Sequence, residues 1–281
     1  EGGSRSMTEA LTAMAGSLIF RNALAALLLA GVAGGTVGTY VVTRRLGYIA
    51  GGIAHAILGG IGAAEYLRVI FGWTWLHPLW GAAGAAVLAA LLISWVSQRW
   101  REREDTLIGL LWSAGMAAGI LLLYLTPGYG RDLNAYLFGN ILMAGRREIV
   151  MLAALDAVIA GTIAWYYRPF LALCFDAEYA RLRGVPVERY YSLLLVLTAL
   201  TVVALTVVAG VVLSIALLTL PAAASCRLAR RLSGVMALAV LYSALCGVAG
   251  MVISYLWNLP SGPVIVLVNG IGYLVLVFLR R

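Results

Sequence analysis

Long apolar runs, separated by short polar or arginine-rich turns, make up almost the whole chain. A helix needs about 20 apolar residues, within a range of roughly 17–25, to cross the hydrocarbon core of a bilayer. By that measure the pattern predicts about nine membrane-spanning helices, with eight or ten also possible. The predicted spans are 23–43, 48–73, 79–96, 107–125, 149–167, 190–212, 214–228, 235–257 and 264–279. The seventh span is short and contains Pro221, so we expect it to be kinked or broken.

Two segments outside these spans are expected to form short helices. Segment 131–147 (RDLNAYLFGNILMAGRR) is apolar in its middle but too short to cross, which predicts a helix at the membrane interface. Segment 175–189 (FDAEYARLRGVPVER) mixes acids and bases, and it predicts an amphipathic helix from Asp176 to Arg183 that ends at Gly184. Such a helix could dock into a groove of a soluble partner, or it could lie on the membrane as an ordinary loop helix.

The composition gives the fold class, which is an all-α polytopic membrane protein. Hydrophobic residues are 63% of the chain and charged residues only 11%, whereas a soluble domain has about half and a quarter. We expect a single transmembrane domain over residues 7–281, after an opening EGGSRS (residues 1–6) that reads as a remnant of recombinant expression.

The basic residues are all arginine, and the formal net charge is +8. Most of them lie in turns that a nine-span path brings to one side of the membrane, which the positive-inside bias makes the cytoplasmic side. The C-terminus is then cytoplasmic. This distribution explains the charge without a nucleic-acid partner.

Polar groups inside the spans are the candidate functional residues, because each must find a partner where the bilayer offers none. His55 lies in the small-residue stretch 47–60 (GYIAGGIAHAILGG), where another helix or an ion could approach closely. Glu65, Asp156 and Asn258 are the other three. Imidazole and carboxylate groups facing one cavity would suit a divalent transition metal.

Each of these four residues also has a purely structural interpretation. His55 could bond to the backbone of a neighbouring helix, and Asp156 could likewise be hydrogen-bonded to a neighbour. Glu65 lies near enough to the interface to be solvated. Asn258 could be the C-cap of the eighth span, since asparagine is tolerated after a last helical turn.

Signatures of catalysis are missing from the sequence. It has no phosphate-cradling loop, no Gly-x-Ser-x-Gly elbow and no His-Glu-x-x-His, and its three cysteines lack metal-ligand spacing. An intramembrane enzyme using His55 with Asp156 is disfavoured because no nucleophile or second histidine lies at membrane depth, His77 being in a loop. The sequence therefore favours a transport protein over an enzyme.

Six segments of the chain carry a recognisable set of motifs. They are RRLGYIAGGIAHAILGG, EDTLIGLLWS, YLFGNIL, FDAEYARLRGV, LLTLPAAAS and LPSGPVIVL. In this order and spacing, the motifs resemble the permease subunits of bacterial ABC importers for zinc, manganese or iron. The first segment is similar to the family pattern R-R-x-x-x-x-G-D-x-x-[SA]-H-x-x-x-x-G, and the resemblance covers Arg21 to the C-terminus.

The resemblance implies an inner-membrane transporter built from two copies of this chain, with the pathway for a divalent metal ion between them. Two cytoplasmic ATPase subunits would dock on the coupling helix, at Phe175, Asp176, Glu178, Ala180, Arg181 and Gly184. An extracytoplasmic binding protein would deliver the metal. The chain itself would bind no cofactor and would not hydrolyse ATP, which agrees with the absence of a Walker-type sequence.

Two positions depart from the family pattern. Gly52 stands where an aspartate is usual three residues before the histidine, and Asn258 stands where an aspartate usually precedes the final turn. Losing two negative charges weakens the attraction for a bare divalent ion. Asp156 or Glu65 could replace the charge, or the ion could be held loosely. The substrate could also differ, which keeps open a permease of the same architecture for a metal chelate or an organic cofactor.

Overall fold

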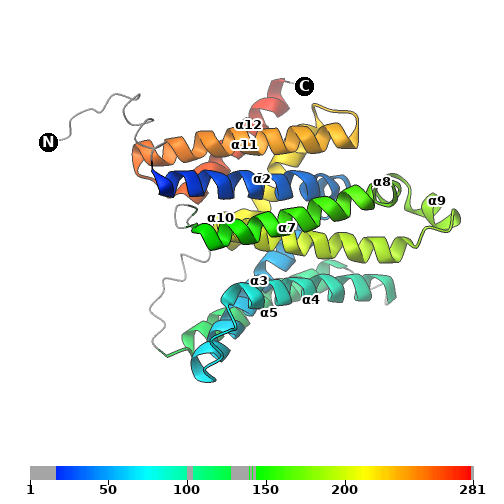
Figure 1. The fold of residues 1–281 in the computed structure, drawn as a ribbon. Coiled ribbons are helices and arrows are strands. Elements are labelled where there is room, and N and C mark those ends of the chain that lie inside the picture. The colour runs from blue at the N-terminus through cyan, green and yellow to red at the C-terminus, as the bar shows by residue number, and fades with distance from the viewer. Residues whose placement is uncertain (1–16, 100–103, 128–138, 140, 142–143, 280–281) are drawn as a thin grey trace.

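The computed structural model describes residues 17–99, 104–127, 139, 141 and 144–279, and the regular structure in these ranges is helical (Figure 1). The segments 1–6 and most of 131–147, for which the sequence made predictions, lie outside the described residues. The helices are α2 (Leu18–Thr43), α3 (Gly47–Ile70), α4 (Pro78–Arg99), α5 (Glu104–Tyr124), α7 (Arg146–Trp165), α8 (Tyr167–Phe175), α9 (Ala177–Leu182), α10 (Val187–Cys226), α11 (Leu232–Trp257) and α12 (Ser261–Leu279).

Within the described ranges, eight helical segments are long and apolar enough to cross a membrane. They include the first part of α10, Val187–Thr206, and they confirm an all-α polytopic membrane protein. The remaining predicted span, the seventh, corresponds to Leu213–Cys226, which is also apolar but shorter. At about 1.5 Å per residue this segment covers only about 20 Å, less than the roughly 30 Å hydrocarbon core.

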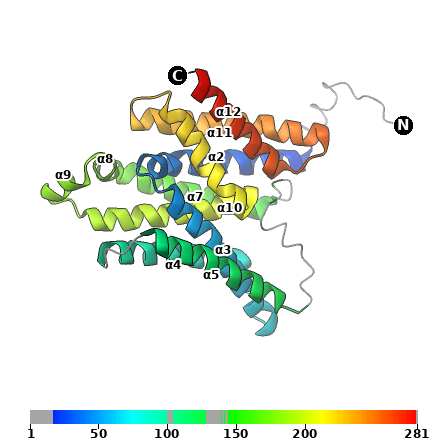
Figure 2. The same cartoon turned by 180° about the vertical axis from the view of Figure 1, so that it is seen from behind.

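The two parts of α10 meet at Gly210, which interrupts the helix. Its φ of 78° and ψ of 169° lie outside helical geometry, in a region that essentially only glycine adopts. After the break the chain turns back toward the end of the molecule from which α10 began (Figures 1 and 2). The break therefore falls at Gly210 and not at Pro221, which lies inside the second helical part.

Helix α3 packs against α5, α4 and α10. Glycines set its distance from α5. A Cβ atom on Gly59 would lie 2.9 Å from the carbonyl oxygen of Gly115, and one on Gly119 would lie 2.6 Å from the carbonyl carbon of Leu58. These backbones therefore touch directly, as the small-residue stretch around His55 predicts.

The turns rich in arginine share one end of the bundle (Figure 1). The α2–α3 turn with Arg44 and Arg45, helices α8 and α9, and the α10–α11 turn lie at this end. The α3–α4 loop, the start of α7 and the α11–α12 turn lie at the opposite end. This alternation arises because the second part of α10 runs in the direction opposite to the first.

Candidate functional site

His55 is buried in the middle of the apolar helix α3, with 8% of its surface exposed. Its ring packs edge-on against Trp112 of α5, with the ring centroids 4.2 Å apart. Its Nδ1 atom is buried and has no hydrogen-bond partner. The structural interpretation of His55 expected a hydrogen bond to the backbone of a neighbouring helix. The structure contains no such bond from Nδ1. An imidazole nitrogen left unpaired at this depth is chemically able to ligate a metal ion.

Gly52, one turn before His55, faces α5 and has no room for a side chain. A Cβ atom there would lie 2.7 Å from Cγ2 and 3.4 Å from the carbonyl oxygen of Ile108. Ile108 is itself 1% exposed. The space that an aspartate side chain would need is therefore occupied by α5. An aspartate at residue 52 would fit only if Ile108 moved.

Asp156 is another buried polar group that has no hydrogen-bond partner among the described residues. It is 7% exposed, and neither of its carboxylate oxygens has a hydrogen-bond partner. It lies on the same buried face of α7 as Leu152, Ile159 and Ile163. The alternative that Asp156 is hydrogen-bonded to a neighbouring helix is wrong. An unpaired carboxyl inside a membrane protein is costly, which makes Asp156 a functional candidate rather than a structural one.

Glu65 has a partner, which the sequence interpretation missed. It is only 3% exposed, so the expectation that water solvates it is wrong. Its Oε1 lies 2.5 Å from Nη2 of Arg68, and its Oε2 accepts a second bond of 3.0 Å from Nε of the same residue. The signal was present in the sequence, because residues three apart on a helix are neighbours. The negative charge of Glu65 is compensated by this pair.

Asn258 ends α11 in the left-handed conformation, with φ 50° and ψ 43°. Its backbone N–H bonds back to the last turn, and the following residue, Leu259, accepts a 2.6 Å bond at its carbonyl oxygen from the hydroxyl of Ser254. The residue is exposed. Asn258 is thus a helix C-cap, the structural alternative for this position.

These four residues come from different parts of the bundle. Helix α3, with His55 and Glu65, packs against α5, α4 and α10, whereas α7, with Asp156, packs against α2 and α10. The described residues contain no group of three or more His, Cys, Asp or Glu side chains that could hold a metal ion. One copy of the chain in this conformation therefore offers single ligands rather than a closed metal centre.

Helix α9 occupies the segment in which the sequence predicts the coupling helix. Asp176 caps it by accepting a 2.8 Å bond from the backbone N–H of Tyr179, and Gly184 ends it with a φ of +79°. Ala180 is buried, and Arg181 forms a 2.6 Å ion pair with Glu188 of α10. These contacts fix the helix against the bundle.

The last residue of α8 and the outward side of α9 expose large apolar side chains, of which the sequence analysis named only Phe175. Phe175, Tyr179 and Leu182 are 70%, 57% and 87% exposed, and Glu178 is exposed beside them. The apolar side chains within the otherwise polar segment 175–189 were the sequence signal for this exposed surface. A short helix that is held from behind and presents large apolar side chains suits docking to a protein partner.

The fold defines the class as a helical, polytopic membrane protein. The model of the family described as ABC 3 transport family matches residues 17–280. The chain belongs to this family and is the permease of a metal ABC transporter. It is a transport subunit, not an enzyme.

Relatives and solved structures agree with this membership. A Chlamydia muridarum protein named "Probable metal transport system membrane protein" is 39% identical over 264 residues, covering 94% of this chain and 89% of the relative. A Halalkalibacterium halodurans protein named "Manganese transport system membrane protein MntC" is 34% identical over 248 residues, covering 88% and 82%. The structure of PsaBC from Streptococcus pneumoniae in complex with Fab matches with a TM-score of 0.86 at 29% identity, covering 98% of this chain and 96% of that one.

Proposed function

We propose that the chain is the membrane-spanning subunit of an ATP-driven importer that moves zinc, manganese or iron into the cytoplasm. The observation that carries this proposal is the buried, unpaired Nδ1 of His55, in a chain that belongs to a metal-transporting family. A nitrogen ligand at membrane depth lowers the cost of passing a divalent ion through the bilayer. Among the three metals we favour manganese, which the names of the Halalkalibacterium halodurans and Listeria monocytogenes relatives specify.

Asp156 is the second pathway residue that we propose. Its carboxylate has no protein partner and would supply negative charge in place of the aspartate that Gly52 replaces. Glu65 is a weaker candidate, because its charge is already compensated by Arg68. Asn258 contributes at most a neutral oxygen near one end of the pathway, since it caps α11.

A pathway between two copies of the chain would explain why one copy offers only single ligands. In such a homodimer each copy would contribute its own His55 and Asp156, and together they could complete the coordination of one ion. Two cytoplasmic ATPase subunits would dock on the end of α8 and on α9, through Phe175, Tyr179 and Leu182, which support this role by their exposure. An extracytoplasmic protein would deliver the metal at the opposite end.

The membrane orientation follows from the arginine-rich end of the bundle. The positive-inside bias favours placing the α2–α3 turn, α8, α9 and the α10–α11 turn in the cytoplasm of a bacterium, with the protein in the inner membrane. The C-terminus then lies on the cytoplasmic side, because α12 runs back toward that end.

A permease for a metal chelate or an organic cofactor is the second candidate. Ile108 fills the place of one acid and the other is replaced by the cap Asn258, so the chain lacks two charges suited to a bare cation. A chelate carries less positive charge and would need fewer acids.

Transport in proteoliposomes with the partner ATPase tests these proposals. We expect the wild type to transport manganese, zinc or iron, and His55→Gln and Asp156→Asn each to lower the rate at least about tenfold, as expected for loss of a ligand or its support. Gly84→Ala is the matched control, since nothing lies within 4 Å of a Cβ atom there. Unchanged metal transport in both variants would refute the site, and transport of a chelate but not of the free metals would favour the second candidate.

A further inference from the structure

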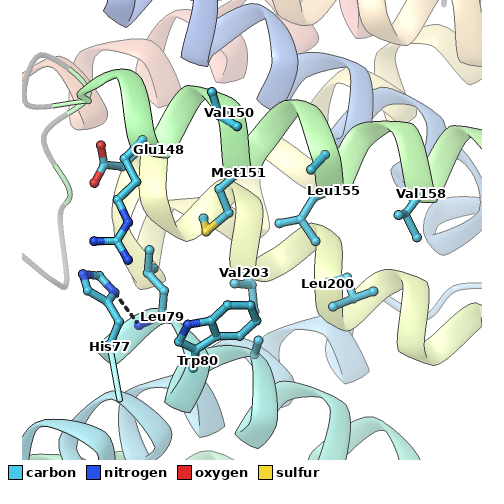
Figure 3. A pocket seen from close by; sticks show the side chains of 13 residues that line it. His77, Leu79, Trp80, Glu148, Val150, Met151, Leu155, Val158, Leu200 and Val203 are labelled. Atoms are coloured by element: carbon cyan, nitrogen blue, oxygen red, sulfur yellow. Dashed lines mark hydrogen bonds between the residues drawn. The ribbon is translucent and has the colours of Figure 1, made fainter. Parts of the chain in front are cut away.

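A pocket of about 430 Å³ lies between α4, α7 and α10, at the end of the bundle opposite the arginine-rich turns (Figure 3). The walls are almost entirely apolar. They include Leu79 and Trp80 of α4, Met151 and Leu155 of α7, and Leu200 and Val203 of α10. The exposed side chains of Trp80 and Val158 at its edge show that the pocket opens toward the outside of the bundle. None of the metal-pathway candidates lines it.

The polar groups of the pocket are confined to one end. Figure 3 shows His77 and Glu148 there, and Val158 and Leu200 at the other end. Arg147 lines the same pocket and makes no hydrogen bond or ion pair with another described residue. The carboxylate of Glu148 accepts a 3.0 Å bond from the backbone N–H of Gly145, so it is engaged in capping α7.

The charge at this mouth is suited to an anion. Arg147 lies in the first turn of α7, and His77 directly precedes α4, so the positive ends of two helix dipoles add to the guanidinium charge. His77 receives a 3.3 Å bond from the backbone N–H of Leu79 at its Nδ1. In that tautomer its Nε2–H is left as a donor.

The depth of the pocket matches one leaflet of a bilayer. From Arg147 to Val158 the helix rises about 16 Å, at about 1.5 Å per residue, and half of a hydrocarbon core is about 15 Å. The α3–α4 loop beside the mouth exposes Trp73 and Trp75, whose rings stack with centroids 6.0 Å apart. Exposed tryptophans are typical of the headgroup level.

From this geometry we infer that the pocket is a binding site for an anionic phospholipid. One acyl chain occupies the apolar walls between α4, α7 and α10, and the phosphate accepts hydrogen bonds from Arg147 and from Nε2–H of His77. A helix of a second copy could also fill an apolar groove, but it would place Arg147, which has no partner among the described residues, against an apolar surface, which is costly. A phosphate pairs with it directly. The inference rests on the membrane fold and not on the identity of the metal.

Native mass spectrometry of the purified chain with added phosphatidylglycerol, and with phosphatidylcholine for comparison, tests this site. We expect retention of phosphatidylglycerol over phosphatidylcholine, and about fivefold weaker phosphatidylglycerol binding in Arg147→Gln, as expected for one basic residue near an anionic headgroup. Arg146→Gln is the matched control, because Arg146 is the exposed neighbour that does not line the pocket. Equal loss of binding in both variants, or in neither, would overturn the assignment.

Filling the apolar part provides an independent test. Ala154→Trp places an indole in the pocket, whereas Ala157→Trp adds the same group to an exposed position of α7 outside it. Only the first should displace the bound phosphatidylglycerol. If Ala154→Trp instead changes the oligomeric state and leaves the number of bound lipids unchanged, the pocket belongs to an interface between copies and the lipid assignment is wrong.

Discussion

At the scale of single residues, the most informative position is Gly52, where a family pattern predicts an acid and the structure leaves no space for one. A Cβ atom at residue 52 would lie only 2.7 Å from Cγ2 of Ile108. Changes at residues 52 and 108 must therefore be compatible with each other. This coupling can be measured.

Gly52→Ala is expected to destabilise the protein by about 1–3 kcal/mol, because it overpacks the contact with Ile108. In the background of Ile108→Ala, which removes Cγ2, the same change should cost almost nothing. Unfolding in detergent of the four proteins of this double-mutant cycle measures the coupling. Gly84→Ala should be neutral or slightly stabilising, since alanine is preferred to glycine inside a helix. Additive effects of the two changes would contradict the predicted contact.

His77 provides a pH-dependent prediction outside the membrane spans. Burial lowers the pKa of its imidazole, and Arg147 and Arg68 lower it further, against smaller opposite effects of Glu148 and Glu65. The unfolded chain then binds a proton more readily than the folded protein does. This contribution to stability is complete above the usual pKa of about 6.5 and is lost as the pH falls through the lower folded pKa.

The apparent unfolding temperature of the wild type should therefore fall between about pH 7.5 and about pH 5.5 more than that of His77→Asn, because asparagine can accept the bond from Leu79 without titrating. Thermal unfolding in detergent at the two pH values checks the difference. Parallel curves for the two proteins would exclude a role for the His77 imidazole in this pH range.

At the scale of the elements, hydropathy was enough to locate the spans, because crossing a bilayer requires long apolar helices. The observed helices begin a few residues earlier than predicted, as at Arg146 of α7, since first-turn residues can be polar and still helical. The predicted boundary between the sixth and seventh spans, at 212–214, lies within a few residues of the observed break, but the pattern did not assign the break to Gly210. One glycine among 32 gives no sign of its backbone conformation, whereas Pro221 drew attention and lies in a continuous helix.

Gly210→Ala is expected to destabilise the protein by about 1–3 kcal/mol, because its backbone conformation strains any residue with a Cβ atom. Gly139 packs against the same point, where its own Cβ atom would lie 2.5 Å from the carbonyl carbon of Ala209. Gly270→Ala, in open space on α12, is the matched control for unfolding in detergent. If both variants unfold like the wild type, α10 does not need a glycine at its break.

The candidate site was only partly predictable, for physical reasons. The cost of burying a polar group singles out His55 and Asp156 from the sequence, but their lack of partners depends on how α3 and α7 pack. Glu65 was misjudged because its partner, Arg68, was not considered. The sequence was compatible with Asn258 as a helix C-cap or as a metal ligand. Only its backbone angles distinguish the two roles.

At the scale of the whole molecule, the proposed assembly depends on α9, the helix that presents apolar side chains at the arginine-rich end. Leu182→Asp is expected to abolish co-purification with the partner ATPase, because it places a charge in the docking surface while the contacts of Ala180 and Arg181 keep the helix in place. His55→Gln should retain the ATPase although it impairs transport. Undiminished co-purification of the Leu182→Asp protein would show that this surface does not hold the ATPase.

The glycine contacts of α3 have a mechanical consequence. Where backbone meets backbone, as at Gly59 with Gly115 and at Gly119 with Leu58, there are no side-chain rotamers that could rearrange to let one helix slip past the other. Helices α3 and α5 should therefore travel together as a rigid body. Any opening and closing of a passage beside His55 must then come from movement of the α3–α5 pair against α10 or against a second copy. Disulfide crosslinks between α3 and α5 should therefore leave the transport rate intact. Crosslinks from α3 to α10 should stop transport.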